Sequence, residues 1–190
     1  MTIADGWTQG GPNKPEAKPI NLDSKITAIL VLDLNARCEN PKKVCSRLMP
    51  AVGKLLEKAR ASSVPIIYSV SGRYKGKPAG EIASPLKRRE GEPVIFPKGF
   101  DKFAGGKFQG FLKPKGIKNV VIVGSSTNMA VLYTATTAAR NHRYNVIIPM
   151  DGVNTRTQYA QEYTFHHFTV LRGGANKRFK FTKQSMITFK

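Results

Sequence analysis

The apolar residues of this chain fall into short continuous runs, and amphipathic stretches separate these runs. A short continuous apolar run is typical of a strand that is buried on both faces of a parallel sheet. The clearest runs predict four such strands, at 26–34, 64–70, 119–124 and 144–150. A final strand, near an edge of the sheet, is predicted at 178–182.

Helical spacing is clearest from Leu48 to Ala61, where several apolar side chains share one face. Further helices are predicted at 127–142, opened by a Ser/Thr cap, at 157–171, and over a short Phe-rich piece of 101–114. Strands and helices therefore alternate along the chain. This alternation predicts an α/β domain of the three-layer, Rossmann-like kind, with a mostly parallel sheet, helices on both faces, and ligands at the carboxyl ends of the strands.

The chain has 190 residues, which suits one domain, and we expect that domain to span 24–190 after an extended N-terminal segment, 1–23. No apolar run approaches the roughly 20 residues of a membrane span. The polar start at 1–19 has no apolar core of a signal peptide. The start is equally compatible with a mature exported protein whose leader has been removed.

The net charge of +19 suggests nucleic acid as a first partner. The basic residues are spread over the whole chain, however, and only 87–89 and 177–178 form tight clusters, with no nucleic-acid motif around them. A dispersed excess is more typical of an adapted surface, or of attraction for small anions. We therefore expect no specific nucleic-acid partner.

Cys38 and Cys45 bracket a loop after the first predicted strand. The three histidines lie far along the chain and there is no Cys-x-x-Cys pair, so the cysteines do not form a metal site. A disulfide is the favoured interpretation and would indicate a periplasmic or secreted protein. Two buried thiols in a cytoplasmic protein are the alternative.

Three features are expected to meet at the carboxyl edge of the sheet: Asp33, the region Lys98–Lys102, and the turn Gly124–Ala130. The turn reads Gly124-Ser-Ser-Thr-Asn-Met-Ala130-Val-Leu-Tyr-Thr-Ala135. It resembles the nucleophile turn of the isochorismatase-like cysteine hydrolases, Gly-x-x-Thr-x-x-Cys-Val-x-x-Thr-Ala, and departs from it only by alanine in place of the cysteine. The resemblance covers about 24–170 and places the family's first-strand aspartate at Asp33.

The resemblance implies a site in which an aspartate takes the thiol proton, a lysine stabilises the thiolate, and backbone N–H groups of the turn bind an oxyanion. It places a cis peptide at Ser125–Ser126 and makes Ser125, Ser126, Thr127 and Asn128 the candidates for binding substrate or oxyanion. Alanine has no nucleophile, so Ala130 closes the covalent route.

Two interpretations of Ala130 remain. Members that hydrolyse isochorismate lack the cysteine, and there the aspartate protonates a vinyl ether that water then attacks, which makes Asp33 a general acid or base. The alternative is a site that binds without turnover. An engineered replacement of cysteine is also possible, although the small residues Ser125, Ser126 and Ala135 around the turn look natural.

The lysine departs from the family pattern as well, because its usual position falls on Pro97. Lys98 is one residue away and Lys102 is the other candidate. The Asp-x-His metal ligands of nicotinamidases are missing from 69–74, so we expect no catalytic metal and no cofactor.

The sequence thus predicts an isochorismatase-family hydrolase that acts on a small, anionic substrate through Asp33 and water. A catalytically inactive small-molecule-binding protein of the same fold is the alternative. The resemblance also implies a homo-oligomer, and the string Ala130–Thr134 is similar to exported members of the family.

Overall fold

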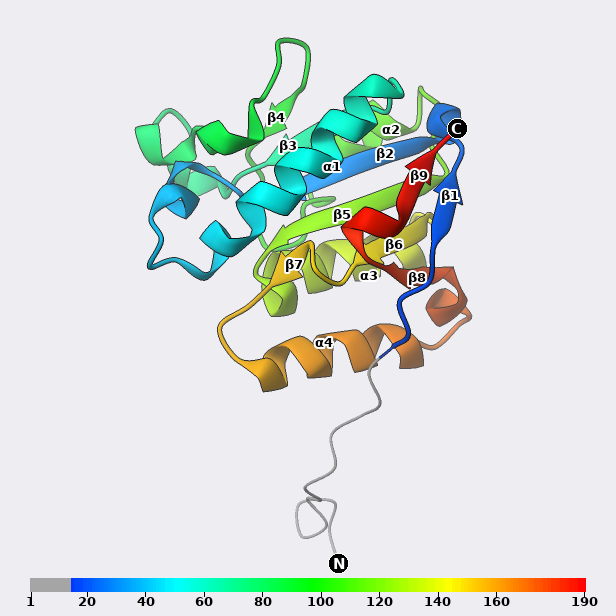
Figure 1. Cartoon of the computed structure of the whole chain (residues 1–190). Coiled ribbons are helices and arrows are strands. Elements are labelled where there is room, and N and C mark those ends of the chain that lie inside the picture. Colours follow the sequence, from blue (N-terminus) through cyan, green and yellow to red (C-terminus); the bar gives the residue numbers. More distant parts are fainter. Residues whose placement is uncertain (1–14) are drawn as a thin grey trace, which may run out of the picture.

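A computed structural model describes residues 15–190 and contains a seven-stranded sheet (Figure 1). Six strands form a path in the order β4-β3-β2-β5-β6-β8, and the short β7 extends the sheet beside β5. All these pairings are parallel. The bounds are Thr27–Leu32 (β2), Ile66–Ser69 (β3), Val94–Ile95 (β4), Asn119–Ser125 (β5), Asn145–Pro149 (β6), Val153–Asn154 (β7) and Phe179–Thr182 (β8).

The two central strands are β2 and β5, and their apolar composition explains their place. Every residue of β2 is buried, and Leu30 pairs in register with Ile122 of β5. Since both faces of these strands are covered, the sheet needs apolar side chains in succession rather than in alternation. The fold is therefore the predicted three-layer α/β arrangement.

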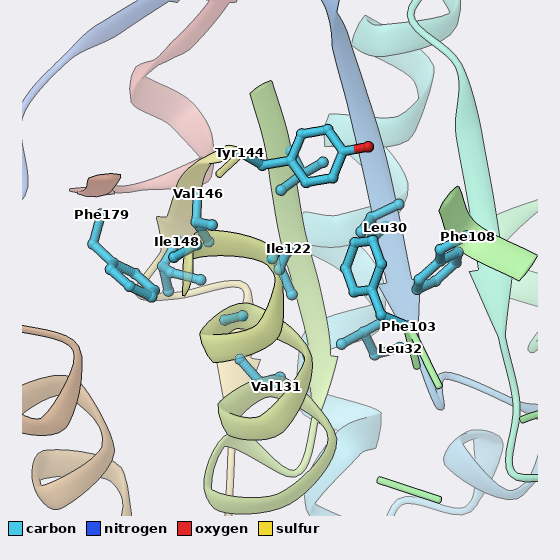
Figure 2. Packing of buried hydrophobic residues seen from close by; sticks show 14 of the residues in the cluster. Leu30, Leu32, Phe103, Phe108, Ile122, Val131, Tyr144, Val146, Ile148 and Phe179 are labelled. Atoms are coloured by element: carbon cyan, nitrogen blue, oxygen red, sulfur yellow. The ribbon is translucent and has the colours of Figure 1, made fainter. Parts of the chain in front are cut away.

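Helices cover both faces of the sheet. Helix α1 (Met49–Ala61) packs on one face through Val52, Leu55 and Leu56. Helices α2 (Lys107–Leu112), α3 (Leu132–Arg140) and α4 (Gln158–Val170) contribute to the core on the other face. Figure 2 shows part of that second core, where aromatic side chains pack beside the aliphatic residues of β2, β5 and β6.

The four buried strands predicted from apolar runs are confirmed, as is the edge position of β8. β8 is not the last strand, however. The strand β9 (Ile187–Phe189) follows it and pairs in parallel with β1 (Ile20–Leu22) in a separate two-stranded sheet, which lies beside α1 (Figure 1). Part of the predicted N-terminal segment is therefore docked on the domain, while residues 1–14 lie outside the described part.

Two predicted helices differ from those in the structure. The Phe-rich helix is confined to α2, because 101–106 form turns that include two glycines with positive φ. The helix predicted at 127–142 opens with a π-helical turn, Thr127–Val131, before α3 begins. No side-chain hydrogen bond caps that turn, so the predicted Ser/Thr cap is wrong. Within residues 15–190, no helix is both long and apolar enough to cross a membrane.

Candidate functional site

A cavity of about 630 Å³ opens at the carboxyl ends of the central strands. Asp33 directly follows β2, Ser71 lies two residues after β3, and Ser125 ends β5; all three line the cavity. Parallel strands place their carboxyl ends at one edge of the sheet, which is why residues far apart in the sequence meet here. The structure thus places the candidate site where the strand pattern predicts it.

The side chains of Asp33 and Lys102 form an ion pair in this cavity, with 2.8 Å between Oδ2 and Nζ. The Lys102 side chain is 1% exposed and that of Asp33 is 20% exposed. The other carboxylate oxygen of Asp33 accepts a hydrogen bond from the backbone N–H of Ser71, at 2.8 Å. Asp33 is therefore held from two directions while part of its carboxylate faces the cavity.

The position of Lys102 is set by its backbone. Its N–H donates to the hydroxyl of Thr134 on α3, at 3.0 Å, and its ammonium also reaches the carbonyl oxygen of Gly99, at 3.4 Å. Lys98, the other candidate, lines the same cavity but is exposed and has no carboxylate partner among the described residues. Of the two predicted lysines, only Lys102 pairs with Asp33.

The turn after β5 forms the next part of the cavity wall. Its backbone lies so close to β2 that a Cβ on Gly124 would stand 2.1 Å from the carbonyl oxygen of Leu32, and the φ of Gly124 is +141°. The Ser125–Ser126 peptide is cis. Both serines and Ala130, which is 1% exposed, line the cavity. The turn therefore needs glycine at 124 to approach the neighbouring strand.

The other two candidates for binding substrate or oxyanion, Thr127 and Asn128, do not line the cavity. Thr127 is fully buried, and its hydroxyl has no hydrogen-bond partner. The side-chain oxygen of Asn128 accepts a hydrogen bond from the hydroxyl of Thr155, at 2.7 Å. These contacts connect Asn128 to the segment after β7 rather than to the cavity.

A disulfide joins Cys38 and Cys45, whose Cα atoms are 5.3 Å apart. Both cysteines line the cavity, so the loop that they close forms part of its wall. The side-chain amide of Asn154 donates to the carbonyl oxygen of Val44, at 2.7 Å, and ties this loop to β7.

Several basic residues at the cavity were not found by sequence reasoning. They come from loops after three different strands: Arg37, Lys43, Arg73 and Arg156. No periodicity or motif singles them out among the 31 basic residues of the chain. Only the topology brings them together. Within residues 15–190, no group of three His, Cys, Asp or Glu side chains is placed to hold a metal ion.

The parallel sheet, its two helical layers and a site at the strand ends define an α/β protein of the Rossmann-like class. The model of the isochorismatase domain matches residues 27–175, so the chain belongs to the isochorismatase family. No curated protein matches the chain.

Solved structures share the fold at low sequence identity. A cysteine hydrolase from Pseudomonas syringae pv. phaseolicola 1448A is similar with a TM-score of 0.74 and 15% identity, over 90% of this chain and 94% of that one. An isochorismatase family protein from Burkholderia thailandensis has a TM-score of 0.72 and 20% identity, over 90% and 97%. An isochorismatase-like hydrolase from Alkaliphilus metalliredigens has a TM-score of 0.71 and 24% identity, over 84% and 95%.

Proposed function

We propose that this protein hydrolyses a small anionic substrate with water that is activated by Asp33. One observation carries the proposal: the Asp33–Lys102 ion pair faces a cavity that is also lined by Ala130, the residue that the resemblance places at the family's nucleophile position. A methyl group cannot form a covalent intermediate. A carboxylate beside an open cavity can still accept a proton from water.

The ion pair favours a general base over a general acid. In the pair, the carboxylate of Asp33 accepts a contact from the Lys102 ammonium, and the same group borders the cavity, where it would accept a proton from water. In the proposed step, one proton of water moves to the carboxylate of Asp33 while the water oxygen bonds to the electrophilic carbon of the substrate. As the bond between that carbon and the leaving group breaks, the proton passes from Asp33 to the leaving group.

Lys102 supports this step by position and charge. Its ammonium holds the carboxylate of Asp33 in one orientation and places a positive charge beside the reacting atoms. Because the lysine is buried, its charge is less screened by solvent than that of a surface lysine. An anionic substrate would be drawn to the same cavity wall.

A hydrolysis screen tests the proposal. Isochorismate, nicotinamide, and ureido and carbamoyl compounds are suitable substrates, since similar structures include a nicotinamidase from Staphylococcus aureus and an N-carbamoylsarcosine amidase from Thermoplasma acidophilum. The wild type is compared with Asp33→Asn and with Glu90→Gln, an exposed carboxylate outside the cavity. We expect Asp33→Asn to lower kcat/KM at least about 100-fold, the lower range for a general base, and Glu90→Gln to leave it unchanged. Ligand-induced thermal shifts without turnover of any compound would refute hydrolysis and favour the binding protein.

A further inference from the structure

The charges that line the cavity are strongly biased. Six cationic side chains face it against one carboxylate, that of Asp33: Arg37, Lys43, Arg73, Lys98, Lys102 and Arg156. Lys102 is already paired with Asp33. The other five are exposed, and none has a carboxylate oxygen within 4.0 Å in the part of the chain that the structure describes. The cavity therefore holds more positive charge than its own residues neutralise.

Two of these cations converge on one aromatic ring. The guanidinium carbon of Arg37 lies 5.0 Å from the ring centroid of Tyr74, and that of Arg73 lies 4.7 Å from the same centroid. Arg37 also donates a hydrogen bond to the hydroxyl of Tyr74. Cation–π contacts offset part of the repulsion between two like charges near one ring, and an anion that contacted both guanidinium groups would offset more of it.

The backbone beneath this group is well anchored. Tyr74 N–H donates to Ser71 O at 2.9 Å, and Gly72 N–H donates to Pro97 O at 2.8 Å. A Cβ on Gly80 would stand 2.2 Å from Tyr74 O, so two loop segments are in close contact here. Tyr74 is therefore a fixed platform on which two arginine side chains rest.

The same backbone relates the platform to the ion pair. Arg37 is four residues after Asp33, and Arg73 is two residues after Ser71, whose N–H binds the carboxylate of Asp33. The arginines therefore flank the proposed reaction centre but belong to the exposed rim of the cavity. An anion bound by them would be held away from the bond that is hydrolysed.

We infer that Arg37 and Arg73, seated on Tyr74, form an anion subsite, so that the substrate carries a second negatively charged group remote from the reacting bond. This inference rests on the proposed function and narrows its substrate to a small dianion. The subsite takes an oxyanion, a carboxylate or a phosphate-like group, because planar guanidinium groups bind both with paired hydrogen bonds. Exposure of the rim makes this binding sensitive to salt.

Calorimetric titration with two series of probes tests the subsite. Succinate, glutarate and adipate vary the separation of two carboxylates, and their monomethyl esters are the matched monoanions. Phosphonoacetate and 3-phosphonopropionate show whether the second group is better as a phosphonate. We expect at least one dianion to bind the wild type about 10-fold more tightly than its monoanion, the range of one charge-assisted hydrogen bond.

Variants assign this preference to residues. In Arg37→Gln and in Arg73→Gln the preference should fall to about 2-fold, because each change removes one charge-assisted partner. Arg172→Gln removes an exposed charge outside the cavity and should retain it. Circular dichroism checks that the variants are folded. An equal preference in all three variants, or no saturable binding of any dianion, would overturn the subsite.

The same titrations in Asp33→Asn separate this inference from the proposed function. A dianion preference that is retained in Asp33→Asn supports the subsite whether or not the protein is a hydrolase, and hydrolysis is refuted if the wild type itself turns over none of the compounds in the screen. Turnover of monoanionic substrates at a rate that neither Arg37→Gln nor Arg73→Gln alters supports hydrolysis and refutes the subsite.

Discussion

Removal of the Asp33 carboxylate alone should destabilise the protein more than removal of both partners of the Asp33–Lys102 pair. The ammonium of Lys102 has two oxygen partners, Asp33 Oδ2 at 2.8 Å and Gly99 O at 3.4 Å. Asp33→Asn keeps an acceptor for Ser71 but leaves a buried ammonium without a counter-charge. Lys102→Met removes that charge with a side chain of similar length.

The magnitude follows from burial. Breaking a buried ion pair by removal of one partner costs about 3–5 kcal/mol. Asp33 is 20% exposed, so solvent screens part of this, and we expect Asp33→Asn to lower the free energy of unfolding by about 2–4 kcal/mol. The carboxylate left by Lys102→Met can be hydrated from the cavity, so we expect that variant to lose only about 1–2 kcal/mol.

A double-mutant cycle measured by urea denaturation tests the pair. The double variant Asp33→Asn/Lys102→Met leaves no unpaired charge. The sum of the two single losses of unfolding free energy should therefore exceed the loss in the double variant by a coupling energy of about 1.5–3 kcal/mol. The exposed pair Glu16–Lys18, at 3.2 Å, is the matched control, and its cycle should give less than about 0.5 kcal/mol. Additivity within about 0.5 kcal/mol at Asp33 and Lys102 would refute the reasoning.

Three further predictions concern Glu92 and the Cys38–Cys45 disulfide. Burial opposes ionisation of Glu92, but hydrogen bonds led by that from Arg60 outweigh it, so the pKa of Glu92 lies below its ordinary 4.5. The stability that ionised Glu92 contributes is present above its unfolded pKa and is lost as pH falls through its folded pKa. Below about pH 4.5 the Tm of the wild type should therefore fall more steeply with pH than the Tm of Glu92→Gln. Parallel curves of Tm against pH would contradict this. The Cys38–Cys45 disulfide should contribute about 2.5 kcal/mol by the chain-entropy relation for a loop of this length, so Cys38→Ala/Cys45→Ala should lower the free energy of unfolding by about that amount. Alkylation of protein from its native host should find no free thiol, and reactive thiols there would argue against an oxidising compartment.

The sequence predicts the layered architecture well because its strongest signals are local. The apolar runs that form β2 and β5 can be recognised without knowledge of their partners. β7 and the β1–β9 pair are missed for the opposite reason: each strand has two or three residues, too few to show a period, and each depends on a distant partner.

For the candidate site too, the sequence predicts the residues that have a local signal and misses those that depend on distant contacts. Asp33 is found because it ends a buried strand, and the turn at Gly124 because its residue types follow a strict spacing. Lys98 and Lys102 lie in irregular turns, so no helical or strand periodicity indicates which of the two side chains points into the site. In the structure the backbone N–H of Lys102 donates a hydrogen bond to the hydroxyl of Thr134 on α3, which lies 32 positions away in the sequence. This contact places Lys102 in the site.

Stability alone does not account for a buried ammonium at this place. Removing two charges from water costs several kcal/mol for each ion, and an apolar side chain at 102 would avoid that cost. The chain instead holds Lys102 against a carboxylate that stays partly open to a cavity of about 630 Å³. If the ion pair served packing only, the protein would be more stable with that cavity filled by side chains, because protein interiors are close-packed. The geometry is better explained by an outside molecule that completes the site, as the proposed hydrolysis requires.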